Sequence, residues 1–182
     1  MPDAPSSGYT VWFTGLSGAG KTTVSRLVAA ELARSGVHVE VLDGDVVRTH
    51  LSKGLGFSKE DRDTNIERIG WVASRLARAG TAVVVAAISP YEASRRRARE
   101  LTEAFAPFLE VHVRASVEEC ARRDPKGLYA RALAGELADF TGVSAPYEEP
   151  LTPELMLDTE LDEPEASAGR VIKMLGARGL FR

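Results

Sequence analysis

The sequence predicts a three-layer α/β fold, in which a five-stranded, mostly parallel sheet carries helices on both faces. Two observations predict this fold. Short apolar and β-branched runs of strand length alternate along the chain with longer stretches whose apolar residues recur at helical spacing. A glycine-rich segment, GLSGAGKT at positions 15–22, stands between the first apolar run and the first helical stretch. Such alternation is typical of parallel sheets, because a helix can return the chain to the start of the next strand.

Composition and charge describe an ordinary globular chain. Its 182 residues suit one domain, and 44% of them are hydrophobic. The formal net charge of −3 argues against general binding to nucleic acids or membrane surfaces, and no apolar run is long enough to span a bilayer. A single cysteine, Cys120, excludes an intrachain disulfide and suits the cytoplasm. We expect residues 1–8 to form a flexible arm without signal-peptide character, and residues 9–182 to form the domain.

Residues 9–14 predict a buried strand, and residues 23–34 predict a helix with one buried side. The segment between them fits the phosphate-loop pattern G-x-x-x-x-G-K-[ST]. Its glycines let backbone N–H groups converge on a phosphate, and the start of the helix adds partial positive charge. Lys21 can reach the β- and γ-phosphates, and the Thr22 hydroxyl can bind Mg²⁺. We therefore expect a nucleoside triphosphate to bind the following residues: Gly15, Ser17, Gly18, Ala19, Gly20, Lys21, Thr22 and Thr23.

The second predicted strand, residues 37–42, runs directly into Asp43-Gly44-Asp45. Ligands of open α/β sheets bind at the carboxyl ends of the strands. One carboxylate could hold Mg²⁺, and the other could orient or deprotonate an acceptor hydroxyl. A plain Asp-Gly turn is the alternative, and the neighbouring phosphate loop favours the functional interpretation.

A short helix is predicted over residues 46–51, followed by a long helix over residues 59–79. In the long helix Arg62, Asn65 and Arg68 recur at three-residue steps, so they share one side. This row is either a solvated face or a cationic track toward a phosphorylated acceptor.

Residues 81–88 are the most apolar run of the chain and predict a central strand. No acidic residue ends it. Ser89 follows, and it could contact a ligand or cap the next helix, residues 91–105. That helix carries four arginines at positions 95–99. Its amphipathic spacing and the acidic charge of the whole chain favour a solvated face over a nucleic-acid site.

The rest of the sheet is predicted from strands over residues 108–113 and 155–159, with helices over 117–123 and 164–176. Between them, about residues 122–150, the sequence has little core character. Segments of this length inside a compact domain are often lids. An enzyme that transfers a phosphoryl group needs such a lid, because water must be kept away from the γ-phosphate.

Beyond the loop, the chain carries these motifs in order: Leu42-Asp43-Gly44-Asp45 with Arg48, Leu55-Gly56-Phe57-Ser58 with Asp61-Arg62 and Asn65-Ile66, Ile88-Ser89-Pro90-Tyr91, Arg123-Asp124-Pro125-Lys126-Gly127-Leu128-Tyr129, Phe140-Thr141-Gly142 and Pro146-Tyr147-Glu148. Together with the loop, over about residues 9–159, this ordered set resembles the adenylylsulfate (APS) kinases. The resemblance implies a P-loop NTPase-type fold. It also implies transfer of the γ-phosphate of ATP, with Mg²⁺, to the 3′-hydroxyl of APS, which gives PAPS and ADP in sulfate assimilation.

The resemblance implies a role for each site residue. Lys21, Asp43 and Asp45 would be catalytic, with Asp45 near the attacking hydroxyl and Asp43 beside Thr22 on the metal side. ATP would also contact the two arginines Arg122 and Arg123. APS would contact the following residues, among which the two phenylalanines would enclose its adenine: Asp45, Arg48, Phe57, Arg62, Asn65, Ile88, Ser89, Lys126, Gly127, Leu128 and Phe140.

The chain departs from the family pattern at Glu92, where arginine is common, and in the predicted lid at Ala130, Arg131 and Ser144. None of these departures removes a catalytic group. The resemblance also implies a cytoplasmic homodimer with possible functional coupling to ATP sulfurylase. Its product would serve either sulfate assimilation or a dedicated sulfotransferase. From the residues alone, two alternatives stay open: another P-loop kinase with an anionic alcohol acceptor, and a catalytically silent nucleotide-binding domain.

Overall fold

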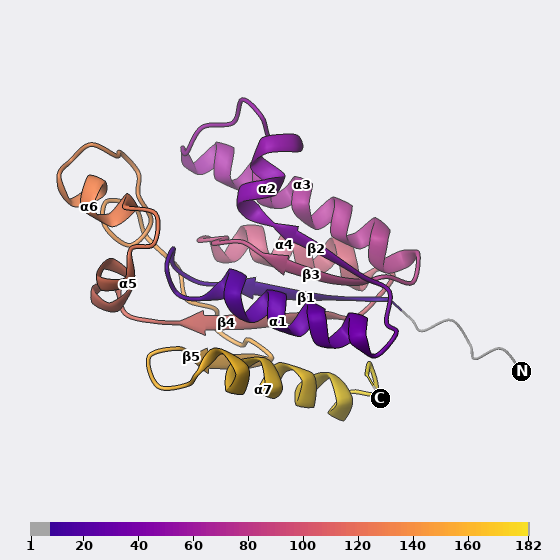
Figure 1. Ribbon diagram of the computed structural model, residues 1–182. Helices are drawn as coiled ribbons and strands as arrows, with labels where there is room; N and C mark the ends of the chain where they lie inside the picture. The colour runs from indigo at the N-terminus through magenta and orange to yellow at the C-terminus, as the bar shows by residue number, and fades with distance from the viewer. Residues whose placement is uncertain (1–7, 182) are drawn as a thin grey trace, which may run out of the picture.

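The computed structural model describes residues 8–181, so the expected arm at residues 1–8 lies, except for Gly8, outside the described residues. Five parallel strands form one sheet in the order β2-β3-β1-β4-β5 (Figure 1). The strands are β1 (Tyr9–Thr14), β2 (Val39–Asp43), β3 (Ala82–Ala86), β4 (Phe108–Arg114) and β5 (Leu155–Asp158). The predicted α/β fold with a five-stranded parallel sheet is confirmed.

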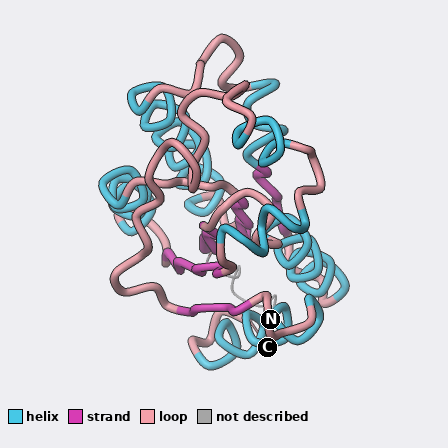
Figure 2. The backbone as a smooth tube through the Cα atoms, turned by 90° about the vertical axis from the view of Figure 1, so that its left-hand side faces the viewer, coloured by secondary structure: helices cyan, strands magenta, loops and turns pink. Residues whose placement is uncertain are grey.

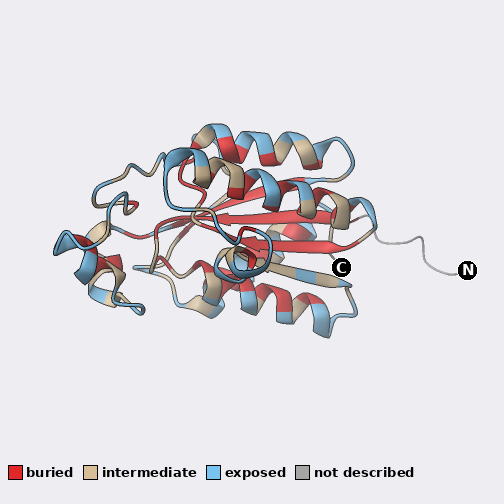
Figure 3. Cartoon of the chain, turned by 90° about the horizontal axis from the view of Figure 1, so that it is seen from above, coloured by how far each residue is buried: buried red, intermediate tan, exposed pale blue. Residues whose placement is uncertain are grey.

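Helices cover both faces of this sheet, so the molecule has three layers (Figure 3). They are α1 (Lys21–Arg34), α2 (Gly44–His50), α3 (Lys59–Arg78), α4 (Glu92–Glu103), α5 (Val117–Arg123), α6 (Leu128–Leu133) and α7 (Pro164–Ala177). The pair α1 and α7 packs together on one face, and the pair α3 and α4 packs together on the other. Among the described residues, no helix is both long and apolar enough to cross a bilayer.

The neighbouring strands β1 and β3 are buried along their whole length because both of their faces are covered. Val11 and Phe13 of β1 point into the core beneath α1 and α7, whereas Trp12 points into the core beneath α3 and α4. On β3, Val83 and Val85 join Trp12. This double burial explains why the sequence shows continuous apolar runs here.

Two helix starts fix the backbone near the carboxyl ends of the strands. The Ser58 hydroxyl accepts a hydrogen bond from the Asp61 N–H at 3.1 Å and caps α3, as its position predicts. At α2 the structure differs from the prediction. The helix begins at Gly44 rather than at position 46, because the Asp43 carboxylate caps it by accepting a hydrogen bond from the Asp45 N–H at 3.0 Å.

The predicted solvated face of α4 is wrong for two of its four arginines. Arg95 is only 1% exposed and forms an ion pair with Glu110 of β4, at 2.8 Å. Arg99 is largely buried and forms two hydrogen bonds to Glu154. The other two arginines are exposed. Helical spacing could not reveal the buried pair, because Glu110 and Glu154 lie outside α4.

The segment 122–150 contains the end of α5, helix α6 and an irregular return toward β5. It lies beyond the carboxyl ends of the strands (Figure 1), and Figure 2 shows loops gathered around these ends. The fold therefore brings the segment 122–150 to the same edge of the sheet as the phosphate loop.

Candidate active site

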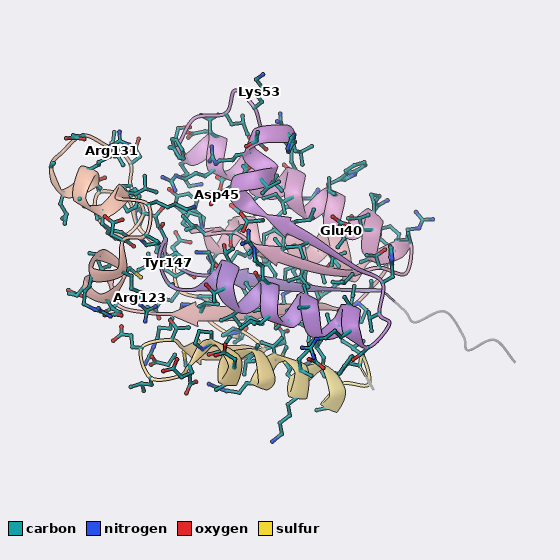
Figure 4. The ribbon with its side chains drawn as sticks, viewed as in Figure 1. Glu40, Asp45, Lys53, Arg123, Arg131 and Tyr147 are labelled. Carbon is teal, nitrogen blue, oxygen red and sulfur yellow. The ribbon has the colours of Figure 1, made fainter. Side chains whose placement is uncertain are left out.

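A cavity of about 780 Å³ opens at the carboxyl ends of the strands. The phosphate loop, the starts of α2 and α3, the chain after β3 and the segment 122–150 all contribute to its wall. Asp45 and Arg123, labelled in Figure 4, belong to different parts of this wall. The structure brings together all the predicted site residues except Gly15, Ala19 and Gly127, which do not line the cavity.

The phosphate loop turns back on itself before α1. Gly15 adopts φ +149°, and a Cβ there would lie 2.3 Å from the carbonyl oxygen of Val113, so only glycine fits. The buried Lys21 ammonium donates hydrogen bonds to the carbonyls of Gly15 (2.9 Å) and Leu16 (2.7 Å). Burial is the main cause that lowers the Lys21 pKa to about 8. The loop thus holds a dry ammonium group at the start of a helix, which suits an anion.

Thr22 and Asp43 adjoin at the edge of this loop. The Thr22 hydroxyl donates a hydrogen bond to one Asp43 carboxylate oxygen at 3.0 Å, and the other oxygen caps α2. A hydroxyl and a carboxylate side by side next to a phosphate site are the oxygen ligands that Mg²⁺ prefers. These two residues therefore fit the metal role predicted for them.

Asp45 forms an ion pair with Lys126 of the segment 122–150. Both side chains stay largely exposed. The pair joins α2 to the segment at the cavity wall, where both residues also line the cavity.

The row of polar residues on α3 divides into two parts. Arg62 and Asn65 are buried and line the cavity, whereas Arg68 lies outside it and donates a hydrogen bond to the Leu51 carbonyl at 3.1 Å. The Asn65 side-chain oxygen is buried without a hydrogen-bond partner in the described part of the chain. A buried polar atom of this kind is a place where a ligand can bind.

Arg62 is held rigidly on three sides. It donates hydrogen bonds to the Phe57 carbonyl (2.7 Å), the Thr141 hydroxyl (2.6 Å) and the Asp139 carbonyl. Two of these acceptors belong to the segment 122–150. A fixed guanidinium beside the unpartnered Asn65 oxygen makes this end of the cavity suited to an anionic, polar ligand.

The two predicted aromatic residues line the same cavity. Phe57 is 60% exposed, and the Arg48 guanidinium lies 4.4 Å from its ring centroid. Phe140 is half-buried and packs edge-on against Tyr129, with the ring centroids 4.9 Å apart. Their enclosure of an adenine ring stays a prediction.

A sequence model of the adenylylsulphate kinases matches residues 7–158, which is most of the chain. The chain belongs to the adenylylsulphate kinase family.

Relatives within this family are similar along nearly their whole length. The adenylyl-sulfate kinases of Picosynechococcus sp. and Myxococcus xanthus are 55% and 54% identical to it, covering 94% and 97% of this chain and 96% and 95% of theirs. A solved structure of the Mycobacterium tuberculosis APS kinase CysC, in complex with AMPPNP and APS, superposes with a TM-score of 0.91. It is 45% identical and covers 94% of this chain and 99% of its own. The family predicted from the motifs is thereby confirmed.

Ser89 does not cap the following helix, so that predicted alternative is wrong. The N-cap of α4 is Tyr91, and the first backbone N–H of the helix, at Glu92, donates to a Glu148 carboxylate oxygen at 2.7 Å. Ser89 is instead buried at the cavity wall, where its hydroxyl accepts a hydrogen bond from the Trp12 indole at 3.1 Å. A capping carboxylate from a distant segment left no local signal in the sequence.

Arg122 and Arg123 both bond to Glu119, and these bonds are the main cause that lowers the Glu119 pKa to about 2. Arg122 is highly exposed, whereas Arg123 also donates to the Thr159 carbonyl at 2.6 Å. The Thr159 hydroxyl in turn donates to a phosphate-loop carbonyl at 2.7 Å.

The chain after β5, residues 159–164, lines the cavity too. Sequence reasoning missed it, although its place at a strand's carboxyl end was the available signal.

Proposed function

We propose that the chain transfers the γ-phosphate of ATP to the 3′-hydroxyl of APS, giving PAPS and ADP. One observation carries the proposal: a single cavity joins a phosphate loop to the buried Arg62 guanidinium and Asn65 amide on α3. The loop would take the donor, and Arg62 and Asn65 would take the anionic part of the acceptor. The family relative solved with AMPPNP and APS supports this pairing of ligands.

On the donor side, Lys21 would exchange its two backbone carbonyls for oxygens of the β- and γ-phosphates. Its charge would act with little screening, because the ammonium is buried. Thr22 and Asp43 would hold Mg²⁺, which neutralises phosphate charge when it is bound. Arg123, fixed against the loop, would add positive charge beside the phosphates.

On the acceptor side, Asp45 would accept the proton of the 3′-hydroxyl as that oxygen bonds to the transferred phosphorus and the bond to the leaving ADP breaks. Asp45 must first leave its ion pair with Lys126 or share it with the substrate. Phe57 and Phe140 would enclose the adenine of APS, and Arg48 lies beside the first of these rings.

The segment 122–150 would act as a lid that excludes water from the phosphates, and it would bring Lys126, Gly127 and Leu128 to APS. From the family resemblance we further expect a cytoplasmic homodimer that works in sulfate assimilation. Functional coupling to ATP sulfurylase belongs to the same expectation.

An assay of purified protein with Mg·ATP and APS, coupled to detection of PAPS, tests the proposal. We expect PAPS to form, and we expect Lys21→Ala to abolish its formation. Failure of the parent protein to form PAPS would overturn the proposal. Turnover of a different alcohol would then favour another kinase, and ATP binding without any turnover would favour a silent nucleotide-binding domain.

A further inference from the structure

Ser89 lies at the cavity wall in an unusual backbone conformation. Its φ of +42° falls in the left-handed region, which side chains other than glycine rarely adopt. The residue is only 1% exposed, and it lines the cavity. Surrounding contacts must therefore hold this backbone in place.

Arg95 supplies the main contact that holds it. Its guanidinium donates a hydrogen bond of 2.7 Å to the Ser89 carbonyl and forms ion pairs with Glu110 (2.8 Å) and Glu92 (2.6 Å). The side chain is 1% exposed, so its charge is stabilised by these partners rather than by water.

The same guanidinium also reaches the end of the segment 122–150. It donates a hydrogen bond of 2.7 Å to the Glu148 carbonyl, while the Glu148 N–H donates to the Pro90 carbonyl at 2.8 Å. Next to it, the Tyr147 hydroxyl is hydrogen-bonded to the Thr14 hydroxyl at 3.0 Å. Figure 4 shows Tyr147 near the carboxyl ends of the strands. The segment is thus fixed to the wall of the cavity where it returns toward β5.

We propose that Arg95 is a positioning residue for the acceptor half of the site. Its guanidinium holds the Ser89 backbone and the end of the segment 122–150 in fixed positions relative to each other. The inference rests on the proposed function. Arg95 does not line the cavity, so it touches no substrate and acts through Ser89 and Glu148.

The geometry requires arginine rather than any cation. The planar guanidinium serves two carbonyls and two carboxylates in different directions. A lysine has a single nitrogen and could keep the charge beside Glu110, but it could not reach the Ser89 and Glu148 carbonyls together. Arg95→Lys therefore keeps the positive charge beside Glu110 but removes the simultaneous hydrogen bonds to the Ser89 and Glu148 carbonyls.

The test compares Arg95→Lys and Arg95→Met with Arg99→Met. Arg99 is the matched control, because it lies one turn further along α4 and forms ion pairs with Glu103 and Glu154 away from the cavity. It shares Glu110 with Arg95, but its contact to that carboxylate is longer, at 3.7 Å rather than 2.8 Å. For each protein we would measure the KM for APS, the Kd for AMPPNP and the melting temperature. We expect Arg95→Lys to raise the KM for APS about tenfold or more, since small misplacements of a site are costly. The Kd for AMPPNP should change less than about twofold, because substitutions at distant sites act nearly independently.

Hydrogen exchange gives a readout that does not depend on turnover. We expect backbone amides of residues 87–92 and 145–150 to exchange faster in Arg95→Lys than in the parent, and to be unchanged in Arg99→Met. Three results would overturn the inference: unchanged exchange at these amides, an unchanged KM for APS in Arg95→Lys, or an equal rise in Arg99→Met. If the parent forms no PAPS, the proposed function fails, and the exchange experiment still decides whether Arg95 holds the Ser89 backbone.

Discussion

Lys126 of the segment 122–150 forms an ion pair with Asp45 at the start of α2. The two residues are 81 positions apart, and both line the cavity. Because both are largely exposed, water screens their attraction, and the pair contributes at most about 1 kcal/mol to folding. Its importance lies in placing a residue of the segment 122–150 beside the proposed proton acceptor.

Asp45→Asn should lower kcat by about a hundredfold or more, because general-base catalysis of this kind contributes about 10²–10⁴-fold. The melting temperature should hardly change, since the side chain is exposed. Steady-state assays and thermal unfolding check both expectations. Asp63→Asn is a matched control, because that half-buried carboxylate on α3 also pairs with a lysine but does not line the cavity. A kcat within about twofold of the parent in Asp45→Asn would exclude a catalytic role for this carboxylate.

Arg62→Lys should raise the KM for APS by about tenfold or more. The substitution removes the fork that bonds Phe57, Thr141 and Asp139, and hydrogen bonds to charged groups are worth about 1.5–3 kcal/mol. Arg68→Lys is the matched control on the same helix, because Arg68 does not line the cavity. Initial rates over a range of APS concentrations would show the difference. Equal KM values for the two variants would contradict the assignment of Arg62 to the acceptor.

Phe57→Ala should weaken APS binding while leaving folding stability within about 0.5 kcal/mol, since the ring is 60% exposed. The lost ring face would otherwise stack on adenine, an interaction worth about 0.5–1.5 kcal/mol beyond burial. Calorimetric titration with APS measures this loss. Phe105→Ala, which removes a comparably exposed ring outside the cavity, should leave APS affinity unchanged. The predicted adenine enclosure would be wrong if both variants bound APS as the parent does.

Binding of an ATP analogue with Mg²⁺ should take up protons near pH 8. Burial lowers the Lys21 pKa to about 8, so at that pH part of the population carries a neutral amine. Phosphate oxygens favour the ammonium form, so binding raises the pKa and draws a proton from the buffer. Affinity should accordingly fall as the pH rises above about 8. Calorimetry in buffers of different ionisation enthalpy measures the uptake, which should vanish about two pH units lower, where Lys21 is already protonated. Equal uptake at both pH values would assign the proton to another group.

The sequence by itself determined the fold class and most of the cavity wall. Strand runs and helical spacing are local patterns, and parallel strands necessarily bring their carboxyl ends to one edge of the sheet. The phosphate loop and the motifs that follow other strands therefore had to converge there. For this reason the positions of Lys21 and Asp43 could be predicted before their surroundings were known, whereas the site role of Arg62 was implied only by the family resemblance.

Only the tertiary structure decided which charged groups meet. Helical spacing in α4 suggested a solvated row of arginines, yet Arg95 is buried against Glu110 and the Ser89 carbonyl. The left-handed backbone of Ser89 and the pairing of Lys126 with Asp45 likewise had no local signal. Periodicity tells which side of an element a residue occupies, but its partner comes from a distant segment. Packing brings the two charged groups together, and their burial and hydrogen bonds then set how strongly they interact.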